Sequence, residues 1–246
     1  PMKRRNLLAG IAAGFTAGCS KIGESDAFGG LVKTAEGLHR VAHRTLGGRQ
    51  ALAREYDRSD ISPFFRGNGT QDPGTRLYAG HMATGFIDWR LDVMGLVDNP
   101  LSLSVEEIAG MPQRTQITRH DCVEGWSAIG EWTGPQLSHL LDLAQVTEDA
   151  RYIVFHCADE LNGVAYYESI DMSDAYHPQT IIAHRLNGEP LPIRNGAPLR
   201  LRVERQLGYK HAKYLTGIEA VASLDRVGGG NGGYWEDRGY QWYAGI

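Results

Sequence analysis

The sequence predicts an α+β fold built mainly from β-strands with short helices. Apolar and polar residues alternate at residues 115–120 and 199–204, as they do in strands. Apolar residues at helical spacing form short runs, such as the one at residues 137–144. The 31 glycines indicate many loops and turns, and 246 residues are enough to bury a sizeable core.

Residues 30–58 are predicted to form a helical segment, because their apolar residues share one helical face. Gly47-Gly48 breaks the segment, and the pattern allows it to resume over Ala51–Tyr56. Packing against the rest of the domain is the favoured interpretation. The alternatives are docking to a membrane partner and metal ligation by His39 and His43.

Residues 60–112 predict a loop, a strand and a short helix. The loop spans the polar, Gly- and Pro-rich residues 60–75, and the strand spans residues 89–98. Ser104 and Glu107 form a capping box, which predicts a helix over Ser104–Ala109.

The central segment, residues 115–141, predicts a strand that delivers Cys122 into a tight turn. A loop and the helix at residues 137–144 are expected to follow. Three glycines punctuate the predicted loop, at positions 125, 130 and 134.

The second half of the chain continues with short elements. Strands are predicted at residues 152–157 and 199–204. A turn at Asn162-Gly163 is expected before residues 166–168, a helical turn capped by Ser173 after them, and a hairpin turn at Asn187-Gly188. The tail, residues 228–246, combines glycines with aromatic residues. It predicts an ordered strap across the domain, with a lining for the substrate entrance as the alternative.

Charge and cysteine content exclude some classes of function. The net charge of −4 and a pI of about 6.2 give no electrostatic support to a nucleic-acid partner. Cysteines occur only at positions 19, 122 and 157, and none forms a CxxC zinc pattern.

Residues 1–26 are predicted to be a twin-arginine export signal. Arg4-Arg5 precedes the apolar run Leu7–Ala17, which is too short to span a bilayer. Such signals are read by a bacterial export system, so a periplasmic location is expected. Thr16–Cys19 resembles a lipoprotein cleavage box with Cys19 as acceptor. We expect residues 27–59 to be a helical extension and residues 60–246 to be the catalytic domain.

The residues alone leave three interpretations of Cys122. It is a small core residue, a disulfide partner of Cys157, or a buried thiolate that binds a large group. The loop after it, with Trp126 and Trp132, suits the third interpretation.

Two motifs then point to a family. HDCVEGWS at His120–Ser127 and the block Leu186–Val221 resemble the sulfite oxidase superfamily of molybdopterin enzymes. The resemblance is strongest to the branch that contains the periplasmic methionine-sulfoxide reductase molybdoenzyme, and it covers roughly Ile61–Val221. It implies a sulfite oxidase-type molybdopterin-binding fold, with mainly mixed β-sheet and short helices, and Mo-molybdopterin as cofactor.

The resemblance also implies the site. Cys122 matches the molybdenum ligand and is therefore the expected catalytic residue. Cys157 replaces a cofactor-contacting threonine of the family. An arginine fork suits the terminal phosphate of the cofactor, and thiolate suits molybdenum. The cofactor-binding positions implied by the resemblance are Asn68, Cys157, Asn195, Arg200, His211 and Lys213.

The family implies a two-electron oxygen-atom transfer. Sulfite-oxidising branches carry arginines just after the cysteine, whereas this chain carries Glu124 and Trp126. A carboxylate repels the sulfite dianion, and Trp126 is expected to wall an apolar pocket, although Arg119 or Arg200 could supply charge from elsewhere. Reduction of a neutral S-oxide or N-oxide is therefore expected; the alternatives are a sulfite-type oxidase and a non-catalytic cofactor-binding or scaffold protein.

Electrons are expected to pass through a separate redox protein. The sequence contains no CxxCH haem motif and too few cysteines for an iron–sulfur cluster. A b- or c-type cytochrome, soluble or membrane-bound, is the partner that these features favour.

Overall fold

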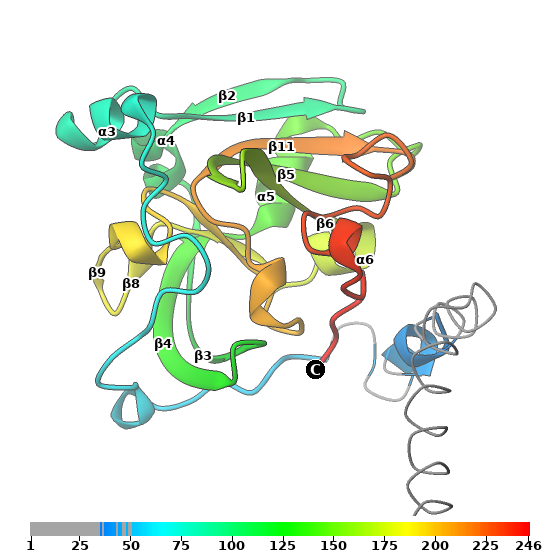
Figure 1. Ribbon diagram of the computed structural model, residues 1–246, viewed down its shortest axis with the longest axis horizontal. Coiled ribbons are helices and arrows are strands. Elements are labelled where there is room, and N and C mark those ends of the chain that lie inside the picture. Colours follow the sequence, from blue (N-terminus) through cyan, green and yellow to red (C-terminus); the bar gives the residue numbers. More distant parts are fainter. Residues whose placement is uncertain (1–34, 36, 43, 46–47, 49–50) are drawn as a thin grey trace, which may run out of the picture. The chain divides into compact units, whose positions relative to one another are not determined.

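The computed structural model describes residues 35, 37–42, 44–45, 48 and 51–246 (Figure 1). The chain divides into two compact units, Pro1–Arg49 and Gln50–Ile246. Described residues between 35 and 45 are helical, as expected. The predicted export signal lies outside the described residues, and so does His43. No helix in the described part of the chain has the length and apolar character needed to cross a membrane.

The helix does not resume over Ala51–Tyr56, contrary to the prediction. This segment is extended, and Glu55 forms a β-bridge with Thr118. The Tyr56 amide donates to the Ile117 carbonyl at 2.9 Å, because the edge of the neighbouring strand offers backbone partners. The second unit therefore begins before the expected boundary at residue 60, and a short 3₁₀ helix η1 (Arg58–Asp60) follows.

The larger of the sheets has five strands and is mixed, as the family resemblance implied. Its order is β2-β1-β11-β5-β6, with β1 parallel to β11 and the other pairs antiparallel (Figure 1). The strands are β1 (Arg90–Gly95), β2 (Leu101–Ser104), β5 (Tyr152–Leu161), β6 (Val164–Asp171) and β11 (Leu215–Val221).

A second, four-stranded sheet carries the central cysteine. Its order is β3-β4-β8-β9, and a separate antiparallel pair joins β10 to β7. The long hairpin of β3 and β4 ends where Cys122 faces Trp126, with Gly125 at φ 85° in the turn. The strands are β3 (Gln113–Cys122), β4 (Trp126–Pro135), β7 (Ile181–Ala183), β8 (Arg185–Leu186), β9 (Glu189–Pro190) and β10 (Arg200–Arg202).

Gly130 and Gly134 lie inside β4 and not in a loop, so that part of the prediction is wrong. Both are places of close approach, where a side chain has no room. Phe65 and Leu186 pack against Gly130, and the Ile182 carbonyl lies against Gly134. A glycine pattern alone does not separate such packing from a turn.

The helices are short. The capping box of Ser104 and Glu107 is present at α4 (Val105–Gly110), as predicted. Asp171, and not Ser173, caps α6, because its carboxylate accepts from the Asp174 amide. The helices are α3 (Arg76–Ala83), α4 (Val105–Gly110), α5 (Leu137–Ala144) and α6 (Met172–Ala175), with 3₁₀ turns η2 (Ile193–Asn195), η3 (Gly208–Lys210) and η4 (Glu236–Arg238).

Two apolar clusters hold these elements together. The larger packs α5 against the five-stranded sheet, with Leu137, Leu140 and Leu141 fully buried. The smaller surrounds Trp132 and Phe65, whose rings meet edge to face at 5.0 Å. The smaller cluster lies under β4 and therefore supports the strand pair that ends at Cys122.

Gly134→Ala tests this packing. The new methyl group overlaps a backbone carbonyl that cannot rotate away, so we expect a loss of about 1–3 kcal/mol in the free energy of unfolding. Urea denaturation measures it. Gly110→Ala is the matched control, because nothing lies within 4 Å of its added Cβ and helix propensity favours alanine. Equal stability of the two variants would contradict the close approach.

Candidate functional site

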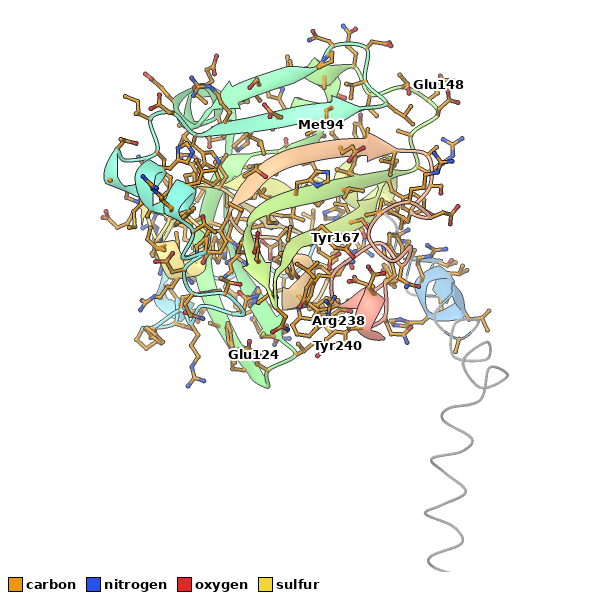
Figure 2. The ribbon with its side chains drawn as sticks, turned by 45° about the horizontal axis from the view of Figure 1, so that its top comes forward. Met94, Glu124, Glu148, Tyr167, Arg238 and Tyr240 are labelled. Carbon is orange, nitrogen blue, oxygen red and sulfur yellow. The ribbon has the colours of Figure 1, made fainter. Side chains whose placement is uncertain are left out.

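A cavity of about 170 Å³ lies beside the end of the β3–β4 hairpin. Glu124 of the hairpin turn and Tyr240 of the tail both line it, and Figure 2 shows them at the same end of the molecule. Its walls come from five separate chain segments. Four of the predicted site residues line it: Asn68, Cys122, His211 and Lys213.

Cys122 is the last residue of β3 and is 9% exposed. Its carbonyl accepts from the Gly125 amide at 3.0 Å, which closes the turn and turns the residue toward the cavity. Burial raises the pKa of the thiol, while the Glu124 amide opposes this shift. The thiol is therefore neutral at neutral pH, and a bound cation would favour the thiolate.

Arg200 lies in the core and does not line the cavity. It is fully buried on β10, as is Arg202, although alternating arginines on a strand are ordinarily exposed to solvent. Its guanidinium donates to the Asn195 carbonyl at 2.8 Å and lies 4.9 Å from the Trp132 ring centre. Among the described residues no carboxylate forms an ion pair with it. Burial lowers the pKa of Arg200 to about 9, and the positive charge of Arg202 is the second cause.

Lys213 brings a second positive charge to the cavity wall. Its ammonium donates to the Thr70 carbonyl and, at 3.2 Å, to the Arg194 carbonyl. Burial lowers the pKa of Lys213 to about 7, and the positive charge of Arg200 is the second cause. Two clustered cations with carbonyl partners suit an anionic ligand.

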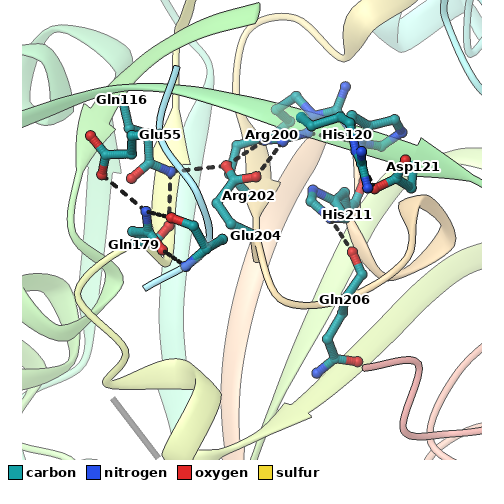
Figure 3. A network of polar contacts seen from close by, with 12 residues as sticks. Glu55, Gln116, His120, Asp121, Gln179, Arg200, Arg202, Glu204, Gln206 and His211 are labelled. Atoms are coloured by element: carbon teal, nitrogen blue, oxygen red, sulfur yellow. Dashed lines mark hydrogen bonds and ion pairs between the residues drawn. The ribbon is translucent and has the colours of Figure 1, made fainter. Parts of the chain in front are cut away.

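Two neutral histidines meet behind Cys122, and the sequence reasoning missed one of them, His120. Its ring centre lies 4.9 Å from that of His211. Burial lowers the pKa of both well below the usual range, and neighbouring positive charges add to the shift. Arg202 donates to His120 Nδ1 at 2.9 Å, so the ring proton is on Nε2 (Figure 3). His211 Nε2 donates to the Gln206 carbonyl at 2.9 Å, which leaves Nδ1 as an acceptor.

The two predicted asparagines are held by their amide groups. Asn68 donates to the Gly208 carbonyl at 3.3 Å. Asn195 donates to the Arg66 carbonyl at 3.2 Å, in the wall behind the cavity. Both side-chain oxygens remain without a hydrogen-bond partner.

Cys157 does not line this cavity. It lines a separate groove and belongs to the main apolar core, and burial raises its pKa well above the usual range. Cys122 and Cys157 are both free thiols, so the disulfide alternative is wrong. The residues of β5 that line the cavity are Asp159 and Leu161.

Four aromatic residues line the cavity, but Trp126 is not one of them, contrary to the prediction. Its indole N–H donates to Glu124 at 2.9 Å, and its ring packs edge to face on Phe65. The tail provides part of the lining, as the alternative for that segment proposed. The aromatic side chains that line the cavity are Tyr166, Tyr209, Trp235 and Tyr240.

The site fits a flat anionic cofactor rich in donors and acceptors. Several polar atoms around it are buried and have no partner in the protein, which is costly unless a ligand supplies one. Arg200 in addition lacks a counter-charge. The unpartnered atoms are Asn68 Oδ1, His120 Nε2, Asp159 Oδ1, Asn195 Oδ1, Arg200 Nε and His211 Nδ1.

We expect Arg200→Met to weaken cofactor retention. Methionine keeps most of the length but removes the charge, and a charge-assisted hydrogen bond contributes about 1.5–3 kcal/mol, so affinity falls roughly tenfold to a hundredfold. Molybdenum per purified chain measures this. The control is Arg119→Met, whose side chain is 54% exposed and pairs with Asp121. Unchanged molybdenum content in Arg200→Met would remove Arg200 from the site.

The stability of the cofactor-free protein is expected to depend on Lys213. Its folded pKa of about 7 lies below the ordinary 10.5, so the unfolded chain binds more protons between these values. The free energy of unfolding therefore rises with pH across this window, by up to about 1.4 kcal/mol per pH unit. Urea titrations of the parent and of Lys213→Met measure it. The same slope in both proteins would contradict the burial of a charged ammonium.

Comparison with known proteins identifies the family. Residues 81–226 match the oxidoreductase molybdopterin binding domain. A putative protein-methionine-sulfoxide reductase subunit, YedZ1 of Azospira oryzae, is 44% identical over 157 residues, which are 64% of this chain and 56% of that protein. The protein-methionine-sulfoxide reductase catalytic subunit MsrP of Campylobacter jejuni is 32% identical over 144 residues, 54% of this chain and 48% of that protein. The chain thus spans about half the length of these relatives.

A solved structure has the same type of fold. The sulfane dehydrogenase SoxCD of Paracoccus pantotrophus superposes with a TM-score of 0.51 at 24% identity, over 56% of this chain and 39% of that chain. At this identity the likeness shows the fold alone. The family match shows that this chain belongs to the oxidoreductase molybdopterin binding domain family, in which molybdopterin is the cofactor.

Proposed function

We propose that this chain is the molybdenum-binding subunit of an oxidoreductase that reduces a neutral S-oxide or N-oxide by two-electron oxygen-atom transfer. The observation that carries the proposal is the position of Cys122, whose thiol faces a cavity backed by an unpaired buried guanidinium. The names of the relatives, which include methionine-sulfoxide reductase subunits, support the oxide as substrate.

Different residues of the site bind different parts of the cofactor. Cys122 provides the thiolate for the metal, and Arg200 and Lys213 provide positive charge for the anionic end of the cofactor. Asn68 and His211 offer an acceptor oxygen and an acceptor nitrogen that can orient a heterocycle. When bound, the molybdenum cofactor supplies the two-electron chemistry.

The charge of the wall favours a neutral substrate over sulfite. Glu124 and Asp159 both line the cavity, and both repel a dianion when ionised. The ammonium of Lys213 faces the carbonyls of Thr70 and Arg194, so it offsets this repulsion only in part. Arg119 is paired outside the cavity, and Arg200 lies behind its wall.

Asp159 is the group we assign to proton supply. Reduction of an oxide to water consumes protons. Burial raises the pKa of Asp159, and its Oδ1 is buried without a partner. A carboxyl that retains its proton closer to neutral pH is suited to deliver it at the cavity.

We further propose that the protein acts in the periplasm, after export through the signal at residues 1–26, with or without lipidation of Cys19. A separate b- or c-type cytochrome, soluble or membrane-bound, would deliver the electrons. The twin-arginine motif supports the location, and the word subunit in the names of the relatives supports a multi-component system.

The substrate assignment is tested with molybdenum-loaded protein. We expect reduction of dimethyl sulfoxide or of a free amino-acid sulfoxide with a reduced dye, and little oxidation of sulfite with an artificial acceptor, because the carboxylate of Glu124 lines the cavity. Spectrophotometric turnover measures both. Efficient sulfite oxidation without oxide reduction would overturn the proposal, and no turnover at full molybdenum occupancy would favour a non-catalytic protein.

Cys122→Ser is the control for the metal site. A hydroxyl is a harder and poorer ligand for molybdenum, so we expect turnover to disappear while the circular dichroism spectrum stays the same. Cys157→Ser changes the other buried thiol outside the cavity and should retain turnover. Full activity of Cys122→Ser with molybdenum bound would refute the role of Cys122.

A further inference from the structure

Residues 51–56, here called the edge segment, lie along the outer edge of β3 and outside the family match, which begins at residue 81. We propose that the edge segment positions residues that hold the cofactor, so that its docking on β3 and the binding of the cofactor strengthen each other. The proposal goes beyond the proposed function, because it rests on the cofactor site and not on the substrate.

The edge segment pairs with the strand that ends at the metal ligand. Glu55 forms a β-bridge with Thr118, and the Tyr56 amide donates to the Ile117 carbonyl at 2.9 Å. The other edge of β3 is paired with β4. The edge segment thus covers the remaining edge of β3 and restrains the strand that delivers Cys122.

Polar contacts from two side chains hold the edge segment in place. The amide group of Gln179, which is fully buried, accepts from the Ala53 amide at 2.7 Å and donates to the Ala53 carbonyl at 3.0 Å and to Glu55 at 2.9 Å. Arg114 forms an ion pair with Glu55. None of residues 51–56 is buried, so the segment depends on these polar contacts and can detach without unfolding the domain.

Gln116 connects these contacts to the arginines behind the cavity (Figure 3). Its side-chain oxygen accepts from Arg114 at 2.7 Å, and its amide nitrogen donates to the Gln179 carbonyl and to Glu204, each at 2.9 Å. Glu204 accepts in turn from Arg202 at 2.9 and 2.5 Å. Because Gln116, Glu204 and Arg202 are buried, water has little access to replace a lost partner, and displacement of one side chain affects the next.

Arg202 carries the network to the cofactor site. It donates to His120 Nδ1 at 2.9 Å, and the His120 ring meets that of His211 in the cavity wall at 4.9 Å. Arg202 also lies 4.3 Å from the ring centre of Trp132, which Arg200 contacts as well, at 4.9 Å. The edge segment is therefore connected, through side chains that never reach the cavity, to the histidine pair and the cations behind Cys122.

The connection acts in both directions. A cofactor that fixes Arg202 and His120 also fixes Glu204 and Gln116, and so lowers the cost of ordering the contacts that hold the edge segment. Thermodynamic linkage requires that docking of the segment raises cofactor affinity by the same factor. Couplings between sites are typically about fivefold to 150-fold.

Glu55→Ala tests the effect of docking on the cofactor. The Glu55 side chain is 41% exposed, so the fold should persist while Arg114 and Gln179 lose a partner. We expect the purified holoprotein to lose molybdenum about fivefold faster or more during dialysis, measured as molybdenum per chain. Glu55→Gln keeps an acceptor oxygen and should lose it more slowly than Glu55→Ala. Arg54→Ala is the matched control, an exposed residue of the same segment whose guanidinium faces the Tyr56 ring at 4.7 Å.

Hydrogen exchange tests the reverse effect of the cofactor on docking. The amides of Ala53 and Tyr56 should exchange about fivefold more slowly or better in the molybdenum-loaded protein than in the cofactor-free protein. The reference is the Thr147 amide, which donates to the Leu96 carbonyl at 3.0 Å outside the network. Gln116→Leu removes the middle of the network, so the effect of the cofactor at Ala53 and Tyr56 should fall to that at Thr147.

Two results would overturn the proposal. One is equal loss of molybdenum from Glu55→Ala and Arg54→Ala, and the other is an equal effect of the cofactor on exchange at Ala53, Tyr56 and Thr147 in the parent. Both comparisons stand even where Gln116→Leu does not fold. Neither measurement uses a substrate, so absence of oxide reduction would refute the proposed function and leave the coupling standing.

Discussion

The site depends on positive charge that the fold buries behind Cys122. Arg200, Arg202 and Lys213 are all buried, and Glu204 pairs with only one of them, Arg202, at 2.5 Å. Burying an uncompensated charge is costly. Backbone carbonyls and the face of Trp132 reduce that cost without cancelling the charge. The buried positive charge is therefore stabilised by an anion, and the phosphate of the cofactor is the anion that we propose for it.

Glu204 positions Arg202, and Arg202 fixes the tautomer of His120. Glu204 accepts from Arg202 and from Gln116, and Arg202 in turn donates to His120 (Figure 3). A donor on Nδ1 requires the neutral tautomer with its proton on Nε2. The pattern of donors and acceptors presented to a ligand is thus set by residues that never reach the cavity.

The sequence predicted those features that depend on neighbouring residues in the chain. The strand that ends at Cys122, the capping box of Ser104 and the turn at Asn187-Gly188 are all present. His120 and Asp159 were missed because their roles depend on which strands become neighbours. Trp126 was misplaced for the same reason, since its ring packs on Phe65 and His120, which the tertiary structure brings to it.

Two buried lysines, Lys210 and Lys213, have different roles: the first stabilises the fold and the second lies where a ligand binds. Burial alone lowers a lysine pKa, yet Glu168 and Glu236 outweigh it and raise the pKa of Lys210. The Lys213 ammonium donates to two backbone carbonyls, no ion pair with it is among those of the described residues, and burial lowers its pKa to about 7. Lys210 has two carboxylate partners and needs no further counter-charge, and its ion pair with Glu236 fastens the tail. An under-compensated cation gains stability from an anion, and Lys213 lies in the cavity wall, where a ligand can supply one.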